Sequence, residues 1–287
     1  MRHLAGILVW LLALTASPAL AEAPESLRFL ESRLTSIANA SPGNIGIAAL
    51  DLKTGELVAV HGDEPFPMAS TMKVAVAANY LAQVEFGRRS LDERIGGRTA
   101  SELMAAMIIR SDNHATDLLL RNLGGPARLQ QWLDQRNISG MRVDRNIAQL
   151  LAAKRDLWDV RDSATPKAMV ELLRRLENGT LLRPQSSQYL LRLMAQCQTG
   201  KNRMRAMLPV GTRVEHKTGT LSGYSSDVGF ITLPDGRRLA VAFFARAAND
   251  RPRTIATAAR AIYDGFVYAI GTSYSASYGG QPVYVSQ

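Results

Sequence analysis

Ser70 and Lys73 stand three positions apart at the predicted start of a helix, in the stretch Phe-Pro-Met-Ala-Ser-Thr-Met-Lys. Side chains one helical turn apart lie on the same face, with Cβ atoms about 5–6 Å apart. A serine hydroxyl is a poor nucleophile until a neighbour removes its proton, and a buried lysine with a lowered pKa can do so. The pair therefore indicates nucleophilic catalysis by Ser70, although an ordinary helix surface can carry the same two residues.

A second motif, Ser111-Asp112-Asn113, precedes an apolar helix. Asp or Asn in this place is often a simple helix cap. In a catalytic site, Ser111 would pass a proton to a leaving nitrogen, and Asn113 would orient Lys73 and a substrate amide.

A third motif, Lys217-Thr218-Gly219-Thr220, lies at the end of a predicted strand. The Lys217 cation and the hydroxyls of Thr218 and Thr220 could hold a substrate carboxylate. The backbone N–H of Thr220 could join that of Ser70 in an oxyanion hole. By itself, this motif is also compatible with an ordinary turn at the end of a strand.

The elements that must position these motifs follow from hydrophobic periodicity. Strands are predicted at 45–52 and 56–60, and again at 213–217, 226–233 and 238–244. Helices are predicted at 25–39, 70–86, 100–110, 114–122, 126–135, 166–178, 186–198 and 253–269. This order predicts an α/β fold with one antiparallel sheet, flanked by helices and interrupted by an inserted all-helical lobe.

The ends of the chain differ from the rest. A basic start, an apolar run at 4–14 and an Ala-x-Ala end predict a cleaved signal peptide at 1–21. The run is too short for a membrane span, which takes about 20 residues. Residues 22–270 form the predicted catalytic domain, with an α/β lobe (22–65 and 208–270) and a helical lobe (66–207). A disordered tail is predicted at 271–287.

Composition narrows the possible partners. The formal net charge is +9, but Lys and Arg are scattered and aromatic residues make up only 6% of the chain, which gives nucleic-acid binding little support. Cys197 is the only cysteine, so no internal disulfide is expected, and its apolar surroundings predict core packing. The histidines lack the paired spacing of a zinc site. We expect no metal or cofactor, and a soluble, exported, periplasmic monomer without stable membrane insertion.

Taken together, the three motifs resemble those of the class A β-lactamases and penicillin-binding proteins. The resemblance to class A β-lactamases extends over residues 25–270, and it is specific in the stretches 88–95, 111–126, 161–166 and 199–220. It implies the serine β-lactamase/transpeptidase-like fold.

The resemblance also implies a role for each motif residue. Ser70 matches the nucleophile, Lys73 a proton acceptor, Ser111 the proton shuttle and Asn113 the contact to the substrate amide. The carboxylate anchor is matched by Lys217 and Thr218, with Gly219 and Thr220 completing the motif. Arg203 matches a position that supplies a second cation beside that anchor in some family members.

One departure from the family bears directly on function. Class A enzymes carry a Glu, usually within Arg-x-Glu-x-x-Leu-Asn, that activates the water for deacylation. Counting forward from Asp144-Arg145 puts Ile147 at that position, and counting back from Arg161-Asp162 puts Gln149 there. Neither side chain can act as a general base. The family's Asn that braces this loop is Asp117 here.

The sequence thus predicts a serine hydrolase that opens β-lactams through an acyl-enzyme, with slow deacylation. A penicillin-binding D,D-carboxypeptidase acting on the D-Ala-D-Ala end of peptidoglycan stem peptides is the main alternative. A non-catalytic cell-wall or β-lactam sensor is a third, and the intact set Ser70, Lys73 and Ser111 argues against it.

Overall fold

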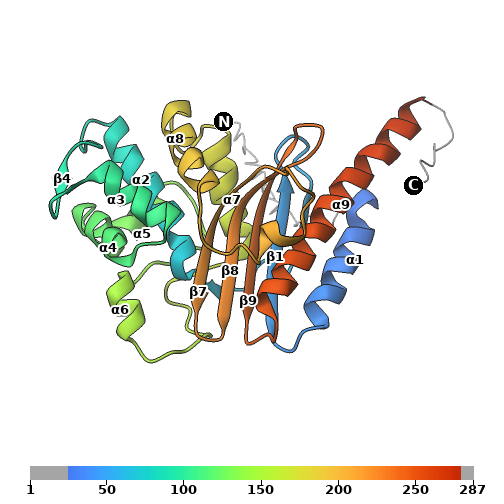
Figure 1. The fold of residues 1–287 in the computed structure, drawn as a ribbon, viewed down its shortest axis with the longest axis horizontal. Helices are drawn as coiled ribbons and strands as arrows, with labels where there is room; N and C mark the ends of the chain where they lie inside the picture. Colours follow the sequence, from blue (N-terminus) through green and yellow to red (C-terminus); the bar gives the residue numbers. More distant parts are fainter. Residues whose placement is uncertain (1–24, 279–287) are drawn as a thin grey trace, which may run out of the picture.

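The computed structural model describes residues 25–278. A five-stranded antiparallel sheet runs through its centre in the order β2-β1-β9-β8-β7 (Figure 1). Its strands are β1 (Asn44–Asp51), β2 (Leu57–Val60), β7 (Val214–Leu221), β8 (Tyr224–Thr232) and β9 (Arg238–Arg246). The strands predicted near the two ends of the chain therefore pair in one sheet, as the sequence analysis expected.

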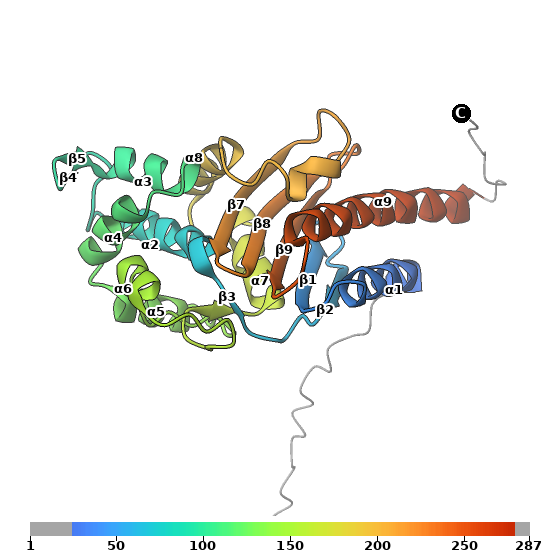
Figure 2. The same cartoon turned by 60° about the horizontal axis from the view of Figure 1, so that its bottom comes forward.

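One face of the sheet is covered by helices from the two ends of the described chain. Helices α1 (Glu25–Asn39) and α9 (Arg251–Tyr278) lie side by side there (Figures 1 and 2). Apolar residues at helical spacing in α1, such as Leu27 and Leu34, are fully buried against this face together with Phe243 of β9. The hydrophobic periodicity thus decides which side of α1 faces the sheet.

The remaining helices cover the other face and gather at the β7 edge (Figure 2). They are α2 (Lys73–Glu85), α3 (Ala100–Ile109), α4 (Asn113–Asn122), α5 (Pro126–Asp134), α6 (Ile147–Ala152), α7 (Pro166–Glu177) and α8 (Pro184–Ala195). Helix α2 is buried from its first residue through Ala82, which explains its run of small and apolar side chains. It forms the centre of the helical part.

Short elements complete the fold. Strand β3 (Phe66–Pro67) pairs with β6 (Ser163–Ala164), and β4 (Arg94–Ile95) pairs with β5 (Arg98–Thr99). Two 3-10 turns, Ala69–Met72 and Met204–Met207, lie beside β7 and α9 respectively.

Besides the short strands β3 to β6 and the 3-10 turns, the structure differs from the predicted elements in two helices. Helix α6 was not predicted, because its six residues are too few to show a period. Helix α9 continues beyond the predicted end at 269 to Tyr278, since no proline interrupts it before Pro282. The prediction of a disordered tail at 271–287 is therefore wrong as far as Tyr278, and the rest of that tail lies outside the described residues.

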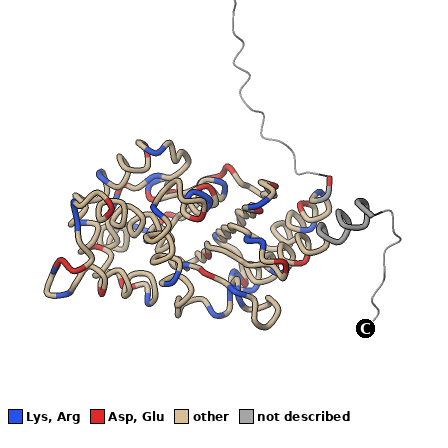
Figure 3. Tube along the Cα trace, turned by 90° about the horizontal axis from the view of Figure 1, so that it is seen from above, with Lys and Arg blue, Asp and Glu red and all other residues tan. Residues whose placement is uncertain are grey.

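The signal peptide predicted at 1–21 also lies outside the described residues, and the lobe boundaries stay predictions. Within 25–278, no helix is long and apolar enough to cross a membrane. Basic and acidic residues are interspersed along the described part of the trace (Figure 3).

Candidate active site

Ser70 lies in the 3-10 turn that joins β3 to α2. The turn begins at Ala69, whose φ of 47° is in the left-handed region, and Thr71 Oγ1 closes it by donating to the Met68 carbonyl at 2.7 Å. The predicted helix start is therefore a tight turn, and α2 proper begins at Lys73. Ser70 is half-buried, and its hydroxyl makes no hydrogen bond within the described part of the chain.

The Lys73 side chain is fully buried and reaches across to the α3–α4 connection. Its Nζ donates to the Ser111 carbonyl at 2.7 Å, to Ser111 Oγ at 3.2 Å and to Asn113 Oδ1 at 2.7 Å. Burial, and next the charge of Lys217, lower the pKa of Lys73 from its ordinary value to about 7. A lysine in this state is an amine in a large fraction of molecules at neutral pH and can accept a proton.

Ser111 lies between α3 and α4, and its side chain links the helical part to strand β7. Its φ of 60° directs the chain from α3 into α4, where Asp112 caps the helix by accepting the Ala115 N–H at 2.8 Å. The Ser111 hydroxyl also accepts a hydrogen bond from Lys217 Nζ at 2.9 Å. Burial lowers the pKa of Lys217 to about 8. Lys73, Ser111 and Lys217 form one hydrogen-bonded group, called here the amine cluster.

Strand β7 brings the third motif to the same place. It is the edge strand of the sheet, and it packs against the turn that carries Ser70. A side chain at Gly219 would meet Met68 O at 2.8 Å and Ser226 Oγ at 2.4 Å, so only glycine permits this approach. Thr220, the next residue, is exposed.

Arg203 supports the end of β7 from behind. Its guanidinium is buried and donates to the Gly219 carbonyl at 2.8 Å, to the Ser226 carbonyl at 2.9 Å and to Thr220 Oγ1 at 2.7 Å. Thr218 Oγ1 lies 2.5 Å from Thr199 Oγ1. The nine residues predicted from the motifs thus converge where the helical part meets β7, while their chemical roles stay predictions.

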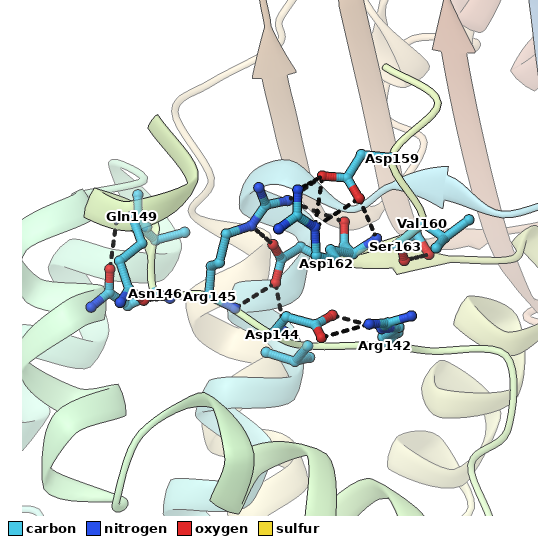
Figure 4. Close-up of polar contacts among 12 residues, drawn as sticks. Arg142, Asp144, Arg145, Asn146, Gln149, Asp159, Val160, Asp162 and Ser163 are labelled. Carbon is cyan, nitrogen blue, oxygen red and sulfur yellow. Dashed lines mark hydrogen bonds and ion pairs between the residues drawn. The ribbon is translucent and has the colours of Figure 1, made fainter. Parts of the chain in front are cut away.

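A loop of residues 144–162, called here the neck loop, is closed by ion pairs (Figure 4). Arg145 Nε donates to Asp162 Oδ2 at 2.5 Å, and Asp162 Oδ1 accepts the Arg145 N–H at 2.9 Å. Arg145 also contacts Asp159 at 3.2 Å. The Asp162 carbonyl accepts the Met68 N–H at 2.8 Å, which ties the neck to the turn before Ser70.

Helix α6 within the neck loop is held by a carboxylate from α4. Asp117 accepts the N–H of Ile147 at 2.8 Å and that of Ala148 at 2.9 Å. The Ile147 side chain is buried, and Gln149 turns back to accept the Asn146 N–H at 3.0 Å (Figure 4). Neither candidate for the missing Glu position can supply a base here.

One buried polar group was missed by the sequence analysis. Cys197 is buried, as predicted, but its Sγ lies 3.3 Å from Thr199 Oγ1, and it interacts with His216. The Nδ1 of His216 lies 2.7 Å from Asp227 Oδ1. The packing of α8 on β7 and the β7–β8 register bring these residues together, so the sequence gives no local signal. In the described residues, no group of three or more His, Cys, Asp or Glu could hold a metal ion.

Fold and motif geometry together define a serine hydrolase with the α/β fold of the class A β-lactamases. Comparison with known proteins agrees. The model of the β-lactamase enzyme family matches residues 29–266, and the chain belongs to this family. Its members are hydrolases that act on the cyclic amide bond of β-lactams.

Individual relatives support the same assignment. The extended-spectrum β-lactamase PER-1 of Pseudomonas aeruginosa is 30% identical over 254 residues, covering 78% of this chain and 82% of that protein. The carbapenem-hydrolyzing β-lactamase KPC of Klebsiella oxytoca is 32% identical over 248 residues, covering 78% and 84%. The solved structure of an ancestral class A β-lactamase superposes with a TM-score of 0.78 at 36% identity, covering 83% of this chain and 100% of that one.

Proposed function

We propose that this enzyme opens β-lactams by forming an acyl-enzyme on Ser70, and that it releases the acyl group slowly. The observation that carries the first half is the amine cluster. Lys217 donates to Ser111 Oγ at 2.9 Å, and Lys73 donates to the same oxygen at 3.2 Å. Lys73 lies one helical turn after Ser70. Two lysines share one hydroxyl, which creates a path for a proton.

In the proposed first step, the Ser70 oxygen bonds to the lactam carbonyl carbon. Lys73, as the neutral amine, takes the Ser70 proton and passes it to Ser111 Oγ, while Ser111 delivers its own proton to the lactam nitrogen as the C–N bond breaks. The N–H groups of Ser70 and Thr220 would stabilise the oxyanion. Asn113, which already accepts from Lys73 at 2.7 Å, would bind the substrate side-chain amide.

Carboxylate capture is assigned to β7. The Lys217 ammonium and the Thr218 and Thr220 hydroxyls would bind the substrate carboxylate. Arg203 adds positive charge from behind, and Gly219 keeps the strand close to Ser70.

The second half of the proposal rests on the neck loop. Hydrolysis of an acyl-enzyme needs a base that activates water, which is worth about 10²–10⁴-fold. The acids of this region are already engaged: Asp117 holds α6, and Asp156 accepts the Trp158 N–H at 2.8 Å. Hydrogen bonds from Arg161 lower the pKa of Asp159 to about 2, so this carboxylate is a very weak base.

The missing base also supports a second candidate, a D,D-carboxypeptidase that acts on the D-Ala-D-Ala end of peptidoglycan stem peptides. Slow release of β-lactams is compatible with such an enzyme. Release of D-Ala from an acyl-D-Ala-D-Ala peptide would favour it over a β-lactamase. A non-catalytic sensor would need no proton path through Ser111.

Labelling with a fluorescent penicillin tests the site. We expect one label per chain in the wild-type protein and none in Ser70→Ala. Ser36→Ala is the matched control, since Ser36 lies on α1 and only donates to the Ser32 carbonyl at 3.0 Å. Labelling of Ser70→Ala at the wild-type rate would contradict the assignment.

We also propose export to the periplasm after removal of residues 1–21. N-terminal sequencing of the protein from its native host should begin near Glu22, and a sequence that begins at Met1 would contradict export by this route.

A further inference from the structure

A line of buried polar groups lies behind β7, on the face opposite the Lys217 side chain. In the β7–β8 register, Thr218 stands opposite Asp227 and His216 opposite Gly229. Because side chains alternate along a strand, His216, Thr218 and Asp227 share one face of the sheet. Lys217 points to the other face, toward Ser111.

These groups form two short series of contacts that interact electrostatically, called here together the polar chain. Asp227 Oδ1 lies 2.7 Å from His216 Nδ1, Cys197 Sγ lies 3.3 Å from Thr199 Oγ1, and Thr199 Oγ1 lies 2.5 Å from Thr218 Oγ1. His216 and Cys197 provide the link between the two parts. The buried Nε2 of His216 has no regular hydrogen bond within residues 25–278, and its interaction with Cys197 shifts the pKa of both groups.

The charges around the polar chain favour ionisation of the thiol near neutral pH. Burial raises the pKa of Cys197, but His216 and next Thr199 and Lys217 outweigh this and lower it to about 7. Burial lowers the pKa of His216, but Asp227 and Cys197 outweigh this and raise it to about 9, so the imidazole is a cation at neutral pH.

Two further groups complete these surroundings. Arg203 lies within electrostatic range of both Asp227 and Cys197. Asp227 Oδ2 also accepts the Met204 N–H at 3.3 Å, which fixes this carboxylate at the buried end of the polar chain.

We propose that Cys197 is a positioning residue whose protonation sets the direction of the Thr199 and Thr218 hydroxyl hydrogen bonds, and thereby controls the capture of carboxylate-bearing substrates. With the thiol protonated, the S–H donates to Thr199 Oγ1, and the nearby His216 acts on the sulfur through its charge. The Thr199 hydroxyl then donates to Thr218 Oγ1. The Thr218 hydroxyl is left to donate to the substrate carboxylate.

Loss of the thiol proton reverses the polar chain. A thiolate can only accept, so Thr199 donates to sulfur and Thr218 donates to Thr199. The Thr218 oxygen then presents lone pairs to the substrate carboxylate, and a negative charge lies behind it. The proton leaves to solvent, and no other bond changes. This inference rests on the proposed function of Lys217 and Thr218 as the carboxylate anchor.

The first test is independent of any substrate. Cys197 is the only cysteine in the chain, so the ultraviolet absorbance of its thiolate can be titrated directly, with Cys197→Ser as the blank. We expect a midpoint near pH 7, and His216→Gln should move it upward by about one pH unit or more. A midpoint at or above the ordinary value of about 8.5, or one that His216→Gln leaves unmoved, would overturn the proposal.

The second test measures binding without acylation, in the Ser70→Ala background. The Kd of benzylpenicillin should rise between about pH 6 and about pH 7.5, and loss of the protonated thiol should contribute about fourfold to this rise. The methyl ester, which lacks the carboxylate, should not show this thiol-dependent part. Adding Cys197→Ser should make the rise about fourfold smaller, because a serine hydroxyl does not ionise in this range, whereas Lys73 and Lys217 titrate in both backgrounds.

Thr199→Val provides a second variant that interrupts the polar chain, and thermal unfolding of each variant checks the fold. We expect Thr199→Val to lose the thiol-dependent part of the rise in Kd, because no hydroxyl then lies between Cys197 and Thr218. A rise in Cys197→Ser or in Thr199→Val as large as in the Ser70→Ala protein would overturn the proposal. If no penicillin binds at any pH, the proposed function fails, and the thiol titration alone decides the state of Cys197.

Discussion

The amine cluster and the neck loop are both tied to the turn that carries Ser70, but their polar groups do different work. In the amine cluster, buried lysines share the Ser111 hydroxyl, and burial lowers the pKa of both amines. In the neck loop, the carboxylates are saturated by arginines and backbone N–H groups. The first region holds groups ready to exchange protons, and the second holds groups that only fix the backbone.

In the proposed mechanism, this difference separates the two halves of a hydrolytic cycle within one fold. Acylation would use the amine cluster, whereas deacylation would need a base on the neck loop. The ion pair of Arg145 and Asp162, with Nε and Oδ2 2.5 Å apart, keeps the neck loop closed. In the proposed mechanism this loop holds no base that could activate the deacylating water. The following predictions test this separation.

The largest effect is expected for Lys73→Ala. Loss of the proton acceptor should slow acylation by about 10²–10⁴-fold. Lys73→Arg should not restore the rate, because a guanidinium stays protonated. Lys53→Ala, on an exposed turn, is the matched control. The measurement is the rate of penicillin adduct formation by rapid-quench mass spectrometry, and a loss of less than tenfold would mean that another group is the base.

The next effect concerns stability. Arg145→Ala leaves the buried Asp162 carboxylate without its partner and should cost about 3–5 kcal/mol of unfolding free energy. Arg142→Ala removes an exposed pair with Asp144 and should cost much less, because an exposed ion pair adds little to stability. Denaturant unfolding measures both. Equal losses of unfolding free energy in the two variants would show that the Arg145–Asp162 ion pair does not stabilise the neck loop more than an exposed pair does.

The pH dependence of acylation should report on Lys73. At saturating penicillin, the rate should fall about tenfold per pH unit below about pH 7, because the protonated amine cannot accept the Ser70 proton. The charge of Lys217 helps to lower the pKa of Lys73. Lys217→Ala should therefore move the acidic limb of the pH–rate profile to higher pH, and Lys217→Arg should leave it in place. A limb that moves to lower pH in Lys217→Ala would contradict the assignment.

The smallest effect is expected from returning a carboxylate to the neck loop. Ile147→Glu combined with Asp117→Asn should speed loss of the adduct by about tenfold, within the range for a general base. Gln149→Glu should have no such effect, because side chain 149 is turned toward the Asn146 N–H. Asp117→Asn alone is the control. Faster loss of the adduct in Gln149→Glu than in the double variant would place the deacylating water beside residue 149 instead of residue 147.

Much of this account was predictable from local patterns. The strands and most helices follow from apolar spacing, and the convergence of Ser70, Lys73, Ser111 and Lys217 follows from three motifs in order. The sequence alone allows either Ile147 or Gln149 at the family's Glu position in the neck loop. The structure favours Ile147, because Asp117 holds the N–H groups of Ile147 and Ala148, whereas the Gln149 side chain turns back to the Asn146 N–H.

What could not be predicted depends on contacts between distant segments. Helix α6 has six residues and is held by Asp117 from α4, so its own sequence carries little signal. The apolar stretch around Cys197 predicts core packing, but α8 packs on β7 and brings Cys197 near His216, and the pairing of β7 with β8 adds Asp227. Helix packing and strand register, rather than composition, create that polar environment.

The separation of the two half-reactions is tested most directly by time-resolved intact-mass spectrometry with benzylpenicillin in excess. We expect the mass of a single penicilloyl group to appear on nearly every chain, and to decay much more slowly than it formed after free penicillin is removed. Steady hydrolysis at tens of turnovers per second or more, with no adduct detected, would show that a base serves the neck loop and would contradict the account.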